Sequence, residues 1–145
     1  GLGSVLGGTD MYRSTTDKLQ FDPVRGLMRG FIDLVFEHQG RFYLVDYKSN
    51  HLGDRPEDYA SDALRAAMQL HKYDLQYLIY TVALHRYLGQ RLPGYEYQRH
   101  FGGVYYLFLR GMRQGHRYGI YHDRPQQGLI EALDLLFAGK SGEAS

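Results

Sequence analysis

Two aspartates and a lysine, Asp33, Asp46 and Lys48, have the types and spacing of a site that hydrolyses phosphodiester bonds. The second aspartate and the lysine form an Asp-x-Lys sequence in a β-rich run, 41–48, and the first aspartate lies in a preceding run, 28–37. Side chains alternate along a strand, so Asp46 and Lys48 point to the same face. The pattern therefore brings acidic oxygens and an amine together at one end of a strand pair.

A turn at Gln39-Gly40 would join the two runs as a β-hairpin in which the numbers of paired residues sum to 79. That register sets Asp33 opposite Asp46. Carboxylates about 5 Å apart repel each other, and more strongly when partly buried. A hard cation such as Mg²⁺, held by carboxylates, a backbone carbonyl and water, relieves that repulsion. An adjacent ammonium can position water and offset the charge that develops on phosphate in the transition state.

An ordinary reading of the same residues remains open. Asp46 and Lys48 can form a simple ion pair at a strand end, with Asp33 marking a bulge. Against this reading, the flanking residues Leu34 and Val45 are apolar, and a buried strand is a costly place for three charges without a ligand.

Four segments together resemble the PD-(D/E)xK nucleases and, within them, the family of RecB nuclease domains, of the exodeoxyribonuclease V type. GFIDLVF (30–36) and DYKSN (46–50) look like the two central motifs. YDLQYLIY (73–80) is similar to the Q-x-x-x-Y helix, and FGGVYYLFLRGM (101–112) to the strand that follows it. The likeness runs from about 19 to 137, and the ordered combination is far more specific than any single motif.

The resemblance implies roles for six residues. Asp33, Asp46 and the backbone carbonyl of Tyr47 become ligands of one Mg²⁺, which Ca²⁺ or Mn²⁺ can replace. Lys48 becomes the catalytic lysine, and Gln76 and Tyr80 also become site residues. The i, i+4 spacing of Gln76 and Tyr80 independently places them on one helical face, where they contact the DNA backbone, brace the metal site or simply pack against the sheet.

The elements expected to carry these residues form an α/β, restriction-endonuclease-like fold, with a mixed central sheet flanked by helices. The hairpin is expected at the centre of a covered sheet, with a strand at 101–110 beside it. One or two helices follow over 57–88, ending near Gly89 and Pro93. A short strand at 118–121 and a helix at 126–137 complete the prediction.

Residues 1–20 are rich in Gly, Ser and Thr and are expected to be a flexible tail or linker before a nuclease domain at 21–145. The glycines do not form a phosphate loop, because no strand precedes them and no Gly-Lys-Ser/Thr follows. The family also places a metal-binding His on a helix upstream of the strands, and none is recognised here. We therefore expect a partial domain from a longer polypeptide.

Composition bounds the function further. Seventeen basic and sixteen acidic side chains give a formal charge of +1, without the strong basic excess of a domain that grips DNA unaided. The absence of cysteine suits a reducing bacterial cytoplasm. No apolar run is long enough for a membrane span and no charged segment precedes an apolar stretch, so we expect neither a span nor a signal peptide.

The resemblance implies a parent enzyme that is an ATP-driven helicase and nuclease of the RecBCD type. Its partners are single- and double-stranded DNA ends and RecC- and RecD-type subunits, and its work is recombinational repair of double-strand breaks. The alternative is that the isolated chain is inactive and serves as a docking module for those subunits or for DNA.

Two further groups of residues are candidates for DNA contact or metal binding. A basic segment, Arg110, Arg113, His116 and Arg117, can contact DNA phosphates or be a solvated loop. His71 and His85 lack metal-ligand spacing and are expected at the surface or in packing.

Overall fold

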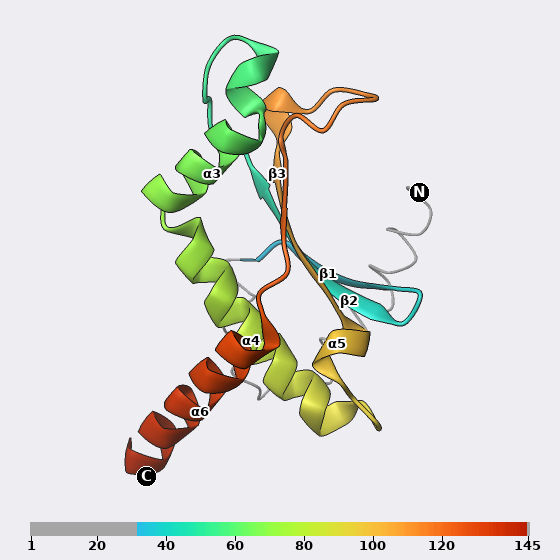
Figure 1. Cartoon of the computed structure of the whole chain (residues 1–145), viewed down its shortest axis with the longest axis vertical. Helices are drawn as coiled ribbons and strands as arrows, with labels where there is room; N and C mark the ends of the chain where they lie inside the picture. Colours follow the sequence, from blue (N-terminus) through green and yellow to red (C-terminus); the bar gives the residue numbers. More distant parts are fainter. Residues whose placement is uncertain (1–31, 145) are drawn as a thin grey trace.

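The computed structural model describes residues 32–144, with the side chains described up to Gly139. The expected tail at 1–20 and the expected strand residues 28–31 lie outside this range. Figure 1 shows a twisted sheet with its long helices grouped on one side. None of the helices in the described range is both long and apolar enough to cross a membrane.

Two strands form the predicted hairpin, β1 (Leu34–His38) and β2 (Arg41–Lys48). The tight turn has positive φ at Gln39 (52°) and Gly40 (80°), as a two-residue hairpin turn requires. Leu34 pairs with Val45 and His38 with Arg41, so the predicted register, in which paired numbers sum to 79, is confirmed.

The start of the first strand was predicted wrongly. Ile32 and Asp33, expected inside a strand over 28–37, precede β1 in irregular backbone, and the strand extends to His38. Alternating apolar residues continue across this boundary, so the pattern could not show where backbone pairing stops.

The sheet has the order β1-β2-β3-β4 and mixes both kinds of pairing. β2 is antiparallel to β1 but parallel to β3 (Phe101–Phe108), and β3 is antiparallel to β4 (Ile120–Asp123). The predicted mixed α/β sheet is therefore confirmed. The expectation that the whole hairpin is central is wrong, because β1 is the edge strand of the described sheet and β2 and β3 form its middle.

The connection between the parallel strands consists of helices, as a crossover requires. A 3₁₀ turn η1 (Pro56–Tyr59) leads to α3 (Ser61–Leu70) and α4 (Tyr73–Arg91). The sequence predicted one or two helices here, and two are present. The second runs through Gly89 to Arg91, because one helical glycine costs only about 1 kcal/mol, which packing offsets.

The short helix α5 (Tyr97–His100) was not predicted, since four residues carry too little periodicity. A 3₁₀ turn η2 (Leu109–Gly111) takes up the end of the strand predicted at 101–110. The strand predicted at 118–121 lies at Ile120–Asp123, and the last helix, α6 (Gln127–Ala144), is longer than the predicted 126–137.

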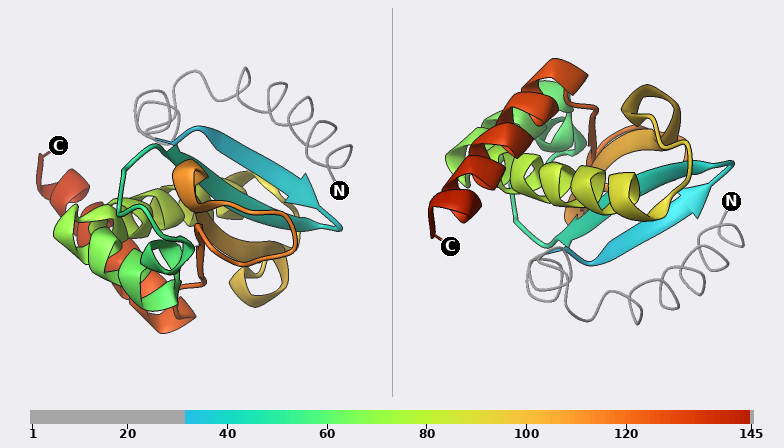
Figure 2. Two further views of the ribbon diagram at one scale, coloured as in Figure 1. Left: turned by 90° about the horizontal axis from the view of Figure 1, so that it is seen from above. Right: turned by 90° about the horizontal axis from the view of Figure 1, so that it is seen from below.

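The core lies between α4 and one face of the sheet, and Figure 2 shows α3, α4 and α6 together on that side. Tyrosines contribute much of it: Tyr77, Tyr80 and Tyr106 are all buried. A bulge in β3 lies at Gly102, where a β-carbon would come within 2.2 Å of the Tyr43 ring. Glycine there lets β3 approach β2 closely enough to pair along the length that carries the site.

Candidate active site

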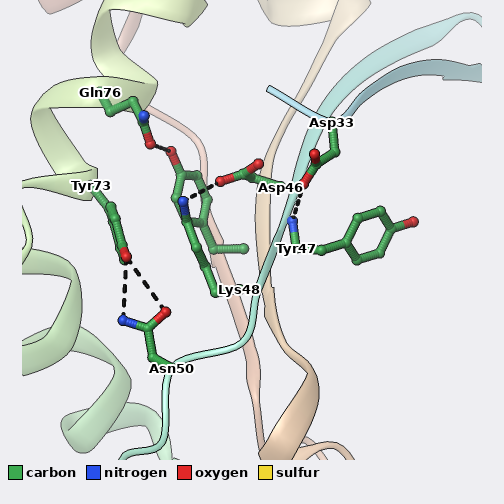
Figure 3. Close-up of polar contacts among 8 residues, drawn as sticks. Asp33, Asp46, Tyr47, Lys48, Asn50, Tyr73 and Gln76 are labelled. Carbon is green, nitrogen blue, oxygen red and sulfur yellow. Dashed lines mark hydrogen bonds and ion pairs between the residues drawn. The ribbon is translucent and has the colours of Figure 1, made fainter. Parts of the chain in front are cut away.

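The predicted acidic and basic groups meet at the carboxyl end of β2, facing α4 (Figure 3). Asp46 is 3% exposed, and the ammonium of Lys48, with its side chain 17% exposed, lies 2.7 Å from Asp46 Oδ2. The two side chains share a face because they are two positions apart on one strand. The ion pair foreseen by the ordinary reading is therefore present, but in a buried setting.

Asp33 comes to the same place from the other strand. Its Oδ2 accepts a hydrogen bond of 2.8 Å from the backbone N–H of Tyr47, so the carboxylate caps β2 where β1 has not yet begun. Asp33 is one step beyond the Leu34–Val45 pair, which puts it opposite Asp46 in the predicted register. The N–H of Tyr47 points toward β1, so the N–H and C=O of the preceding residue, Asp46, point away from β1. At such positions facing side chains approach most closely.

The surroundings of Asp46 disfavour the ionised form of its carboxyl group. Burial raises its pKa to about 6, and the neighbouring Asp33 carboxylate adds to the rise, while Lys48 opposes it. Although Lys48 Nζ is close to Oδ2, no group in the described part of the chain makes a well-oriented hydrogen bond to this oxygen. Two carboxylates that share a buried site beside one ammonium carry an excess of negative charge, which a further cation would offset.

The available donors suit a hard cation. Within residues 32–144 no cluster of three or more His, Asp or Glu side chains occurs, so Asp33 and Asp46 are a pair of carboxylates without a third acidic or imidazole ligand in that range. Mg²⁺ binds typically through one or two carboxylates and completes its shell with water and substrate oxygens. The residues present therefore fit such an ion.

Gln76 and Tyr80 extend from α4 toward the same region. Gln76 Oε1 accepts a 2.7 Å hydrogen bond from the Tyr106 hydroxyl. Burial raises the pKa of Tyr80 to about 12, with Gln76 opposing the rise and Asp46 adding to it. Tyr80 is 4% exposed. Both residues thus lie between α4 and the sheet, close to Asp46.

Three residues near the site were missed by the sequence reasoning: Asn50, Tyr73 and Tyr106. Tyr106 is fully buried and pairs with Asp46 across the parallel β2–β3 ladder. Tyr73, at the first position of α4, contacts Lys48 through its ring and Asn50 through its hydroxyl. A polar-tipped aromatic ring in an otherwise apolar strand was a usable signal for Tyr106, but the parallel register that places it beside Asp46 was not visible.

The basic segment and the two histidines make contacts with other residues or are exposed. Arg110 donates from Nε to the backbone carbonyl of Ser49 at 2.6 Å, while Arg113, His116 and Arg117 are exposed in the loop before β4. His71 is exposed and stacks on Tyr73, and His85 is hydrogen-bonded to Tyr95 at 2.7 Å. Burial lowers the pKa of His85. Surface or packing roles are confirmed for both histidines.

With this geometry in place, comparison with known proteins assigns the class. Residues 7–138 match the PD-(D/E)XK nuclease superfamily, and the chain belongs to it.

The relatives are RecB subunits of RecBCD enzymes. The chain is 57% identical to that of Escherichia coli K12 over 143 residues, 98% of this chain and 12% of the relative. It is 54% identical to that of Haemophilus influenzae over 122 residues, 84% of this chain and 10% of the relative. For Mycobacterium tuberculosis H37Rv the identity is 42% over 153 aligned positions, 96% of this chain and 14% of the relative. The chain thus spans about an eighth of these proteins, and it is a nuclease domain of the RecB type.

Proposed function

We propose that the chain hydrolyses phosphodiester bonds of DNA with a bound Mg²⁺ ion. The observation that carries this proposal is the convergence of two carboxylates and one ammonium, from Asp33, Asp46 and Lys48, in a setting where burial and Asp33 raise the pKa of Asp46 to about 6. Membership of a nuclease superfamily supplies the reaction class. An ordinary structural ion pair between Asp46 and Lys48 would not need a second carboxylate beside it.

Asp33, Asp46 and the backbone carbonyl of Tyr47 would hold the ion. In extended backbone the N–H and C=O of one residue point to the same side of the strand. The N–H of Tyr47 points to Asp33, and its carbonyl therefore points to the side where Asp33 lies. The bound cation would supply Lewis-acid activation of the phosphate and of the attacking water. Ca²⁺ or Mn²⁺ would occupy the same oxygen ligands.

Lys48 supplies the positive charge of the protein itself. Its ammonium, 2.7 Å from Asp46, is placed to orient water and to offset the negative charge that grows on the phosphate oxygens during attack. Gln76 and Tyr80 brace this arrangement from α4. The burial of Tyr80 favours the bracing role over direct contact with the DNA backbone.

We also propose that the chain works within a longer bacterial protein. The RecB relatives are about eight times its length, which supports a parent that is an ATP-driven helicase and nuclease with RecC- and RecD-type partners. In such an assembly the nuclease would degrade unwound DNA ends in the cytoplasm during recombinational repair of double-strand breaks.

The deciding experiment is cleavage of linear single-stranded DNA by the full chain with Mg²⁺, with a chelator and with Lys48→Ala. Cleavage that requires the metal and is lost in Lys48→Ala supports the proposal. Arg91→Gln is the matched control, because it removes a cation at the far end of α4 and should leave cleavage unchanged. No cleavage at high protein concentration would instead favour the docking module, and binding to the partner subunits would then be measured.

A further inference from the structure

The ammonium of Lys48 lies between a carboxylate and two aromatic rings. Besides Asp46 Oδ2 at 2.7 Å, Nζ is 4.1 Å from the centre of the Tyr73 ring and 5.5 Å from that of Tyr106. Both distances are within the range, about 6 Å, in which a cation is attracted to an aromatic face. The rings come from α4 and β3, so two elements distant from β2 in sequence converge on one side chain.

Both rings are themselves held in place. The Tyr73 hydroxyl lies 3.3 Å from Asn50 Nδ2, and its ring packs against His71 at a centroid distance of 5.2 Å and against Tyr106 at 5.6 Å. Tyr106 is fully buried, and its hydroxyl donates a hydrogen bond to Gln76 Oε1. Figure 3 shows Asn50 meeting the hydroxyl of Tyr73. The rings are therefore fixed surfaces, unlike the flexible four-carbon stem of a lysine.

We propose that Tyr73 and Tyr106 form an aromatic frame that positions the Lys48 ammonium for catalysis, with Tyr73 as the principal positioning residue. The inference rests on the proposed nuclease function and deepens it. A carboxylate that shares its charge with a divalent cation attracts Lys48 less, and the cation repels the ammonium. The faces of the two rings attract the ammonium independently of Asp46 and keep it beside the reacting phosphate.

The proposal assigns the effect to the ring of Tyr73 and not to its hydroxyl. Two variants test the ring and the hydroxyl separately. Tyr73→Leu removes the ring face, and kcat for DNA cleavage should fall about tenfold, with KM changed less than about twofold, because the loss affects the transition state. Tyr73→Phe keeps the ring and loses the contact with Asn50, so kcat should stay within about threefold of the unmodified chain. If Phe and Leu lower kcat equally, the frame is refuted.

A second measurement does not depend on cleavage. In nuclear magnetic resonance spectra of the metal-free full chain, the ring faces should shift the Lys48 ε-methylene protons upfield. The shift should largely disappear in Tyr73→Leu and persist in Tyr73→Phe. Tyr87→Leu is the matched control, because Tyr87 is a buried α4 tyrosine beneath another cation, Arg91, and its loss should leave the Lys48 signal in place.

The two measurements distinguish the possible failures. An upfield-shifted Lys48 signal that depends on the Tyr73 ring, in a chain that does not cleave DNA, would retain the frame as geometry but refute its catalytic purpose together with the nuclease proposal. Cleavage with a Lys48 signal indifferent to Tyr73 would refute the frame and leave the nuclease proposal standing.

Discussion

Two carboxylate–cation pairs in this molecule have the same contact distance but different surroundings. Lys48 Nζ lies 2.7 Å from Asp46, and Arg86 Nη2 lies 2.7 Å from Asp134. The Arg86 pair joins α4 to α6 at the surface, with side chains about one-third exposed. Arg86 also donates from Nε to the Asp134 carboxylate at 2.8 Å and from Nη2 to its backbone carbonyl at 3.0 Å.

The Asp46 pair has the opposite character. Its carboxylate is buried, its Oδ2 has the ammonium as its neighbour without the further hydrogen bonds of the Arg86 pair, and burial with a neighbouring carboxylate raises the pKa of Asp46. The exposed pair joins two helices, whereas the buried pair keeps a carboxylate whose charged form is disfavoured where it lies. The two ion pairs have the same contact distance, but they differ in burial and in the number of additional hydrogen bonds.

The largest difference between the pairs should appear in cleavage. Lys48→Met keeps the apolar stem and removes the charge, so the rate with Mg²⁺ should fall about 100- to 1,000-fold, as for other groups that stabilise transition-state charge. Arg86→Met should change the rate less than about twofold. Steady-state cleavage of linear DNA measures both, and equal losses would mean that the two pairs do not differ in function.

The next effect concerns metal binding. Asp46→Asn keeps the shape of the side chain and removes its charge, so binding of Mg²⁺ or Mn²⁺ should weaken at least about tenfold, because hard cations require charged oxygen ligands. Asp134→Asn should bind metal like the unmodified chain. Calorimetric titration provides the test, and unimpaired binding to Asp46→Asn would remove Asp46 from the ligand set.

The pH dependence of stability gives a third test. The Asp46 carboxyl group has a pKa of about 6 in the folded chain against 3.8 as the ordinary value. Below both values its proton is bound in both states and costs nothing. As the pH rises from about 4 to 6, the folded state must bury the ionised form, and stability falls by an amount on the order of 2 kcal/mol.

Asp46→Asn should therefore gain stability relative to the unmodified chain across this pH window, in the absence of metal. Urea denaturation at pH 4, 5, 6 and 7 measures the difference. A variant that is instead less stable at pH 7 would show that the ion pair with Lys48 outweighs the burial cost. Added Mg²⁺ should stabilise the unmodified chain more than the variant.

The smallest effect is expected at the surface pair. Arg86→Met should lower the free energy of unfolding by about 0.5–1 kcal/mol, reduced by salt, because partly exposed ion pairs contribute little. Thermal denaturation at low and high ionic strength would show it. A loss of several kcal/mol would indicate that the α4–α6 contact depends on this pair more than its exposure suggests.

The positions of Asp33, Asp46 and Lys48 relative to one another could be predicted from the sequence because they depend on local structure. A turn at Gln39-Gly40 and the alternation of strand side chains are enough to set Asp33 against Asp46 and to put Lys48 beside it. The roles assigned to these residues, and to Gln76 and Tyr80, remain predictions.

The aromatic part could not be predicted because it depends on distant contacts. Tyr73 comes from a helix and Tyr106 from a strand that pairs in parallel with β2, and the periodicity of a segment does not say which strand it will join. Strand ends were also misplaced, at Asp33 and around β4, where the side-chain pattern continues past the last backbone pair.

The parallel pairing of β2 with β3 also has a consequence for how the domain matures. Asp46 and Tyr106 are neighbours in the sheet yet 60 positions apart along the chain, and closing so long a loop is slow compared with forming a hairpin or a helix. We therefore expect the β1–β2 hairpin to form early in folding, and β3, which brings Tyr106 beside Lys48, to join it later. A partly folded chain would carry the acidic pair before its lysine is restrained.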